Sequence, residues 1–435
     1  MKNTTKKSEF QTKNVKTSFT GTNITKFAGL SPIMKFFGKL RIGKQLNQLF
    51  PTTIHNATKF TNVQIMLSVI LASMSGINRI SRISNFSGDG LVKALLGLKK
   101  QINENAISQC FKKLGEAGAR LFQEFGYKPI SNFIEKTRIK HLTLDCDSTV
   151  FTVYGNQEGA VKGFNPHKKG ANSYHPLIAF GSELKLVVNS WFRTGSAYTS
   201  NGICEFIRQT VAVLPKDIKL FFRADSGFFS GELFDLLELF GINYLVKVKL
   251  KNLQHLLKQQ NWTVTNENKE IAICEFEYKG TGWNKSRKLR AVRLFKQWRE
   301  FENFGQVEKV AEYEYVCFCS DLSGTATELY KKYAERSTSE TWIEQVKSQL
   351  MAGKTLTDDF WANDMLWQMD VFAYNMSVIM RFKIRKFWQQ EHTTFKEWFI
   401  TVPAKLVHTG HQWIMKIHQN YYFKEQWLTL EQLLV

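Results

Sequence analysis

The segment His141-Leu-Thr-Leu-Asp-Cys-Asp-Ser-Thr-Val150 marks the point where the apolar pattern changes from the period of a helix to that of a β-strand. Side chains two positions apart in a strand point to the same face, so Asp145 and Asp147 are predicted to share one face. Apolar residues frame them, namely Leu142, Leu144, Val150 and Val153. Burying a carboxylate in such a strand is costly unless it is paired or bound to a metal ion. We therefore expect an ion pair or a metal site here.

The segments that follow predict a mixed sheet. Three strands come first and form an antiparallel meander, at residues 141–154, 174–181 and 184–193. Helices and strands then alternate, at residues 200–214, 218–224, 230–240 and 243–248. Three antiparallel strands followed by two crossover helices are the order of an RNase H-like sheet, so the predicted fold class is α/β.

This sheet defines the predicted domain organisation. We assign the RNase H-like domain to residues 139–250 and 323–381. Alternating apolar residues between these two parts predict a β-rich insertion at residues 251–322. Residues 382–435 are expected to form a C-terminal helical region, with a helix over residues 404–420.

The N-terminal part of the chain is basic and has helical periodicity. Residues 1–28 are rich in Lys, Thr and Asn and predict a flexible basic tail. Residues 29–138 predict a helical region, whose first helix opens at Ser31 and runs towards Phe50. The whole chain has 59 Lys and Arg against 38 Asp and Glu, a formal net charge of +21. This charge favours a polyanionic partner, nucleic acid ahead of a membrane, and a DNA-binding role for the helical region; a basic but unrelated enzyme is the alternative.

Length and hydropathy limit the class of protein. With 435 residues and 43% hydrophobic content, the chain is long enough for two or three domains. No apolar segment follows the N-terminal lysines as it would in a secretory signal. The longest apolar run, residues 63–77, contains polar residues and falls short of the roughly 20 needed to span a bilayer. A soluble, cytoplasmic protein without a membrane partner is expected.

Two further acidic residues complete a predicted site. Asp225 follows the strand at 218–224 and precedes a Ser-Gly turn. The first and fourth strands of an RNase H-like sheet are neighbours, so we expect Asp147 and Asp225 to lie side by side, with Glu340 arriving from a later helix. Taken singly, each acid also fits an N-cap or a surface salt bridge.

A Coulomb estimate links these acids to metal ions. Two carboxylates about 4 Å apart repel by roughly 4 kcal/mol at an effective dielectric constant near 20, so three would destabilise the fold without cations. Two Mg²⁺ ions, with Mn²⁺ as a substitute, would neutralise them. Such ions activate a water or a 3′-hydroxyl and stabilise the leaving oxygen of an in-line displacement.

A helical spacing, Tyr-x2-Arg-x3-Glu-x6-Lys, surrounds the third acid. At about 100° per residue, its four side chains fall within an arc of roughly 60°. They are Tyr333, Arg336, Glu340 and Lys347. A carboxylate beside two cations and a phenol suits a metal-bound phosphodiester held by basic groups, whereas a solvated helix face is the alternative.

Six segments, in this order, resemble the DDE transposases of bacterial insertion sequences. They are Leu144-Asp-Cys-Asp-Ser-Thr-Val150, Gly163-Phe-Asn-Pro, Tyr174-His-Pro-Leu, Arg193-Thr-Gly-Ser, Phe222-Arg-Ala-Asp-Ser-Gly-Phe228 and the spacing from Tyr333 to Lys347. The similarity covers residues 139–381 and is to the branch with a β-strand insertion in the RNase H-like core.

The resemblance implies which carboxylates act. Asp147 matches the first catalytic residue, with Asp145 as its rival because both face the same way. Asp225 and Glu340 match the second and third, and all of them are the expected metal ligands. Glu344 shares the face of Glu340 but does not fit the spacing.

The resemblance also implies DNA contacts. Tyr333, Arg336 and Lys347 would contact phosphates near the cleaved end and position the DNA. An aromatic residue of the insertion would hold a flipped base, with Trp298 as first candidate and Trp283 as second. Core packing is the alternative for either tryptophan.

The function implied is that of a DNA transposase that binds the terminal inverted repeats of an insertion sequence. It would cleave with divalent metal, then join the freed 3′-hydroxyls to target DNA. Its partner is double-stranded DNA, both element ends and target, and pairing two ends implies a homodimer. The alternatives are an RNase H-like nuclease without strand transfer and a domesticated, non-catalytic DNA-binding protein.

Overall fold

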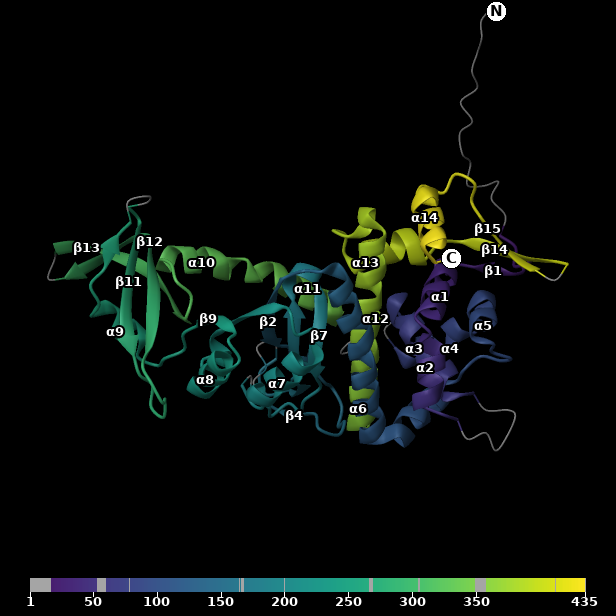
Figure 1. The fold of residues 1–435 in the computed structure, drawn as a ribbon, viewed down its shortest axis with the longest axis horizontal. Coiled ribbons are helices and arrows are strands. Elements are labelled where there is room, and N and C mark those ends of the chain that lie inside the picture. Colours follow the sequence, from purple (N-terminus) through teal and green to yellow (C-terminus); the bar gives the residue numbers. More distant parts are fainter. Residues whose placement is uncertain are drawn as a thin grey trace, which may run out of the picture.

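The computed structural model describes residues 17–434, apart from 53–59, 78, 164, 166–167, 199, 266–268, 304–305, 349–356 and 411. Figure 1 shows an elongated molecule with three parts along its long axis. A β-rich part lies at one end, a mixed sheet with its helices lies in the middle, and a helical part lies at the other end. No helix in these described ranges combines the length and apolar character needed to cross a membrane.

The central sheet has the RNase H-like strand order that the sequence predicts. Its five strands are β2 (His141–Ser148), β6 (Leu177–Gly181), β7 (Leu186–Trp191), β8 (Lys219–Ala224) and β9 (Asn243–Lys247). They lie in the order β9-β8-β2-β6-β7. Strands β2, β6 and β7 pair antiparallel, whereas β8 pairs parallel with both β2 and β9. The carboxyl ends of β2 and β8 therefore meet at one edge.

Helices cover this sheet, whose strands β6 and β7 are buried along nearly their whole length. The crossover helices are α7 (Ile203–Val213) and α8 (Gly231–Leu239). Helix α12 (Phe360–Lys383) packs against β7 on one side and against α3 (Asn62–Met74) and α6 (Glu104–Thr137) on the other. Nearly every side chain of α12 is buried, which fits its position between the sheet and the N-terminal helices (Figure 1).

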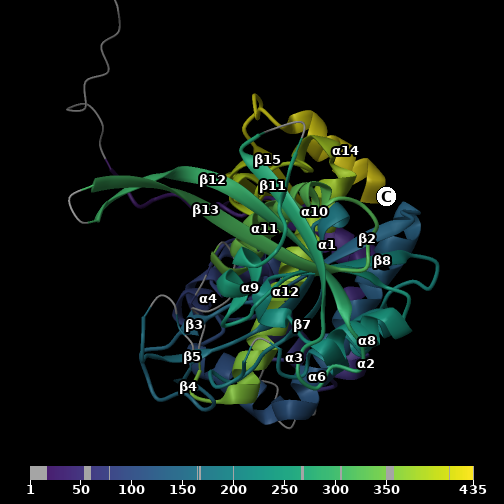
Figure 2. The same cartoon turned by 90° about the vertical axis from the view of Figure 1, so that its left-hand side faces the viewer.

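The strands expected between residues 251 and 322 extend the same sheet. They are β10 (Thr263–Val264), β11 (Ile271–Tyr278), β12 (Arg287–Asn303) and β13 (Gln306–Ser320), preceded by α9 (Leu253–Lys258). Strand β13 pairs antiparallel with β9, so the core sheet continues into nine strands. Strand β11 pairs with β12 only as far as Leu294. Beyond that point β12 and β13 form a two-stranded ribbon that projects from the molecule (Figure 2).

The N-terminal part is helical, but its first predicted helix is wrong in detail. The helices before α6 are α1 (Leu30–Lys39), α2 (Ile42–Leu49), α3, α4 (Ile80–Ser87) and α5 (Gly90–Leu96). One helix was expected from Ser31 towards Phe50, yet two are present. The backbone of Arg41 adopts a left-handed conformation, with φ of 56°, which breaks the helix between α1 and α2. The N-cap of α1 is Gly29 rather than Ser31.

Two expectations about the ends of the chain are also wrong. The helix expected over residues 404–420 is a β-hairpin of β14 (Ala404–Thr409) and β15 (Gln412–Ile417). Burial alternates along β14, which is the period of a strand packed on one face. Helix α14 (Lys424–Leu434) follows it.

The predicted basic tail is only partly outside the described residues. Residues 1–16 are not described, but β1 (Ile24–Thr25) pairs with β14 and makes a three-stranded sheet with the hairpin. Phe27 and Ala28 are buried in the core. The last residues of the expected tail are therefore fixed by apolar burial and strand pairing.

Candidate active site

The ends of two neighbouring parallel strands bring the first two predicted acids together. Cys146 on β2 pairs with Ala224 on β8, so the next residues, Asp147 and Asp225, lie side by side. The carboxylate of Asp147 accepts a hydrogen bond from the backbone N–H of Ser148 at 2.9 Å. Asp225 caps the following 3-10 helix, η3 (Ser226–Phe228), and accepts from the N–H of Gly227 at 2.8 Å.

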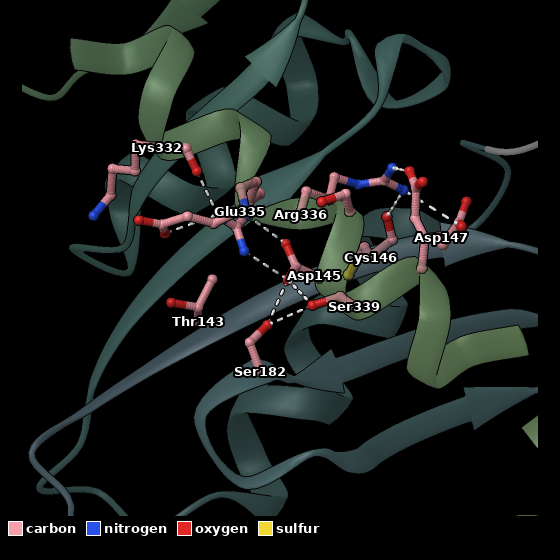
Figure 3. Close-up of polar contacts among 12 residues, drawn as sticks. Thr143, Asp145, Cys146, Asp147, Ser182, Lys332, Glu335, Arg336 and Ser339 are labelled. Atoms are coloured by element: carbon pink, nitrogen blue, oxygen red, sulfur yellow. Dashed lines mark hydrogen bonds and ion pairs between the residues drawn. The ribbon is translucent and has the colours of Figure 1, made fainter. Parts of the chain in front are cut away.

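The third acid comes from a helix that follows the insertion. Helix α10 (Ala326–Ala334) begins with a capping box at Thr325 and Glu328, and α11 (Arg336–Ser348) follows it directly. Glu340 lies on α11 and forms an ion pair with Arg336 one turn earlier. The same guanidinium lies 3.4 Å from Asp147 and donates to the carbonyl of Cys146, as Figure 3 shows. Arg336 thus joins α11 to the end of β2.

The charges of these groups affect one another. Burial raises the pKa of Asp147 from 3.8 to about 6; Arg336 opposes this rise, whereas Asp225 and Glu340 add to it. Burial alone would lower the pKa of Arg336. Its pKa is nevertheless raised, because it lies close to Asp147, Tyr333, Glu340 and Asp225. Burial also raises the pKa of Tyr333, again with contributions from the same three carboxylates. The predicted acids, arginine and tyrosine therefore form one electrostatic cluster.

The donor atoms of this cluster suit a divalent metal ion. Carboxylate oxygens are the ligands that Mg²⁺ prefers, and Asp147 is largely buried without a full ion pair. Within the described ranges, however, no three His, Cys, Asp or Glu side chains are arranged to hold an ion. The guanidinium of Arg336 bridges Asp147 and Glu340 instead. The chemistry of the residues fits a metal, with Arg336 as the cation that the carboxylates share in this structure.

Asp145 has very different surroundings, although it lies on the same strand face. It is 1% exposed and receives two hydrogen bonds from Arg223, at 2.7 and 2.9 Å. The hydroxyls of Ser182 and Ser339 also donate to it. This is the ion pair that the sequence offered as one of two outcomes for a carboxylate in this strand.

The remaining predicted residues lie in different surroundings. Tyr333 packs on Phe318 in a small cluster next to the site. Lys347 is in the last turn of α11, and its side chain lies outside the described residues. Trp298 is 61% exposed on the projecting ribbon. Trp283 packs against rings of the core, which are Phe229, Phe234 and Tyr278.

Sequence reasoning missed Arg223 and Ser339. A signal for Arg223 existed, because it lies two residues before Asp225 and so faces the same side of the sheet. No comparable signal marked Ser339, whose role depends on how α11 packs on β2.

The strand order is that of an RNase H-like sheet, and a sequence comparison identifies the family. Residues 7–434 match the family model described as transposase DDE domain group 1, so the chain belongs to this family. It is a DNA transposase, which catalyses metal-dependent phosphodiester cleavage and transesterification.

The chain was also compared with solved structures and with curated proteins. A piggyBac transposase, in a synaptic complex with hairpin DNA solved by cryo-electron microscopy, is 13% identical with a TM-score of 0.47. The match covers 94% of this chain and 82% of that one. The comparison with curated proteins gave no match.

Proposed function

We propose that this transposase acts on the ends of its own insertion sequence with Asp147, Asp225 and Glu340 as its catalytic carboxylates. One observation carries the assignment. Asp147 and Asp225 end adjacent parallel strands, and Arg336 links Asp147 to Glu340. Asp145 is assigned a different role because Arg223 already neutralises its charge inside the protein.

Two Mg²⁺ ions, replaceable by Mn²⁺, are the metals we propose for these carboxylates. Such ions supply an activated water or 3′-hydroxyl and offset charge on the leaving oxygen. Asp147 must lose its proton to bind them, and its raised pKa makes that step dependent on pH. Arg336 exchanges one of its carboxylate partners for a DNA phosphate. Tyr333, in the last turn of α10, and Lys347, in the last turn of α11, are the other residues we assign to phosphate contacts.

The net charge of +21 supports double-stranded DNA as substrate, both element ends and target. We assign end binding to the helical region at residues 29–138. Its exposed cations include Arg41, Lys44, Lys99, Lys100, Lys112 and Lys113. Trp298, exposed on the ribbon, is the residue we assign to a flipped base. Two ends must be held together during transfer, so we propose that a homodimer acts on the DNA.

The test is Asp225→Asn in purified protein with element-end DNA and Mg²⁺. We expect cleavage to fall to background while DNA binding, measured by gel shift, stays within about twofold, because the change keeps the size of the side chain and removes one metal ligand. Asp217→Asn is the matched control, since Asp217 is exposed in the turn that precedes the opposite end of β8. Normal cleavage by Asp225→Asn would refute the assignment.

Strand transfer needs its own assay. With a supercoiled plasmid as target, the wild-type protein should join the cut 3′ ends to plasmid DNA. Cut ends that are never joined would instead support an RNase H-like nuclease.

A further inference from the structure

A buried polar network lies directly behind the three carboxylates. Its members are Asp145 on β2, Arg223 on β8 and Ser339 on α11. Each of them lies one or two residues before a proposed catalytic residue. Asp145 precedes Asp147, Arg223 precedes Asp225, and Ser339 precedes Glu340. The network therefore touches every element that supplies a catalytic carboxylate.

The hydrogen bonds of the network are short and shielded from water. Arg223 holds Asp145 through two bonds, and both side chains are at most 3% exposed. Ser339 donates to Oδ2 of Asp145 at 2.5 Å (Figure 3). These bonds link two adjacent strands to the helix that carries Glu340.

Arg223 also holds the start of that helix. Its Nη1 donates to the backbone carbonyl of Lys332 at 2.5 Å and lies 3.3 Å from the carboxylate of Glu335. Lys332 is near the end of α10, and Glu335 is the single residue between α10 and α11. The junction of the two helices is thus fixed to β8, and the first turns of α11 are fixed to β2.

This arrangement suits the positioning of a catalytic group better than simple stabilisation. A buried ion pair adds little net stability compared with a well-packed apolar cluster, but it specifies one geometry when all its partners are present. Catalytic groups held on separate elements need such a fixed geometry, because displacement by 1 Å costs much of the rate. Glu340 itself is largely exposed and makes its ion pair within its own helix, so that pair does not fix where α11 sits.

We propose that Asp145, Arg223 and Ser339 are positioning residues that set Glu340 against Asp147 and Asp225. The inference rests on the proposed function for its catalytic consequence. The claim that the network holds α11 in place does not depend on the proposed function.

Two serines provide a matched test. Ser339 and Ser182 both donate to Oδ2 of Asp145 and contact each other at 2.9 Å. Ser182 belongs to the short 3-10 helix η2 (Ser182–Leu184), which carries none of the proposed catalytic residues. Ser339→Ala and Ser182→Ala each remove one neutral hydroxyl and leave the pair of Asp145 and Arg223 in place.

The first measurement is hydrogen exchange of metal-free protein over residues 336–346. Ser339→Ala should speed exchange there by roughly 3- to 10-fold, which corresponds to the loss of one hydrogen bond of typical net strength. Ser182→Ala should leave exchange on α11 within about twofold. Equal exchange in the wild-type protein and Ser339→Ala would overturn the proposal.

The second measurement is Mn²⁺ affinity together with the kinetics of cleavage. In Ser339→Ala we expect Mn²⁺ affinity and kcat to fall by roughly 3- to 10-fold with an unchanged KM for DNA, because only metal geometry is altered. Ser339→Thr, which keeps the hydroxyl, should restore both. Equal losses in Ser182→Ala, matched by equal losses of melting temperature, would show a general stability effect and overturn the proposal.

The two measurements separate this proposal from the function it rests on. If the wild-type protein bound no Mn²⁺ and Asp225→Asn changed nothing, the proposed metal site would be wrong. Hydrogen exchange of α11 would then still decide whether Ser339 holds the helix.

Discussion

The buried network around Asp145 and the carboxylate cluster around Asp147 occupy one face of a single strand, two residues apart. Asp145 is 1% exposed and has a cation and two hydroxyls as partners. The side chain of Asp147 is 26% exposed, and its one cation, at 3.4 Å, is shared with Glu340. The charge is fully compensated in the first region and only partly in the second.

The difference shows that position along one strand decides whether a carboxylate is fully paired inside the protein or remains partly exposed. Asp145 lies where α11 and η2 cover β2, so both of its carboxylate oxygens accept hydrogen bonds from protein donors. Asp147 lies at the strand end, where the covering stops and a ligand has access. A site that leaves carboxylates under-compensated loses some stability and gains a place for cations.

The largest effect should come from breaking the buried network. Asp145→Asn leaves the buried charge of Arg223 with only the exposed carboxylate of Glu335 as a partner, and removing one member of a buried pair typically costs about 3–5 kcal/mol of unfolding free energy. Urea unfolding of the metal-free protein measures it, with Asp217→Asn as the exposed control. A loss below about 1 kcal/mol would mean that the two regions do not differ as described.

Asp147→Asn should increase the unfolding free energy, in contrast to Asp145→Asn. The folded protein raises the pKa of this carboxyl from 3.8 to about 6, so it binds the proton more tightly than the unfolded chain, and stability is lost as pH rises from about 4 to about 6. At pH 8 the substitution should therefore raise the unfolding free energy of metal-free protein by about 1–2 kcal/mol. That is less than the roughly 3 kcal/mol of the full shift, because the side chain of Asp147 is 26% exposed and water screens part of the effect.

The pH dependence provides the check on that result. At pH 4 the carboxyl is protonated in the folded protein and about half protonated in the unfolded chain, so most of the gain should be lost. Unfolding in EDTA at pH 4, 6 and 8 measures this trend. A gain that stays constant with pH would contradict the charge-based account of the cluster.

The smallest effect should come from the exposed edge of the network. Glu335 pairs with Arg223 at 3.3 Å, but its side chain is 70% exposed. Water already solvates such a carboxylate, so Glu335→Ala should change the unfolding free energy by less than about 1 kcal/mol. Urea unfolding beside Asp145→Asn makes the comparison, and similar losses in both variants would show that burial is not what distinguishes them.

Most of the sheet could be predicted because its signals are local. The strand and helix periods between residues 141 and 248 specify the element order, and the known order of an RNase H-like sheet then makes β2 and β8 neighbours. The adjacency of Asp147 and Asp225 follows from that order alone.

Other elements depend on contacts that no local pattern records. The segment at residues 404–420 is apolar and aromatic enough for a helix, and pairing with β1 from the opposite end of the chain makes it a hairpin. The left-handed backbone at Arg41, which divides α1 from α2, likewise has no marker in residue type.

The sequence by itself determined the order of the elements, the RNase H-like fold and the family to which the chain belongs, because these depend on periodicity and on short motifs. The residue pattern put Asp145 and Asp147 on the same side of one strand, and only the resemblance to a family motif favoured Asp147. The tertiary structure showed that the two carboxylates have different surroundings. Arg223 and Ser339, which bond Asp145, are 78 and 194 residues away in sequence, so only the folded chain shows that the charge of Asp145 is compensated and that of Asp147 only partly so.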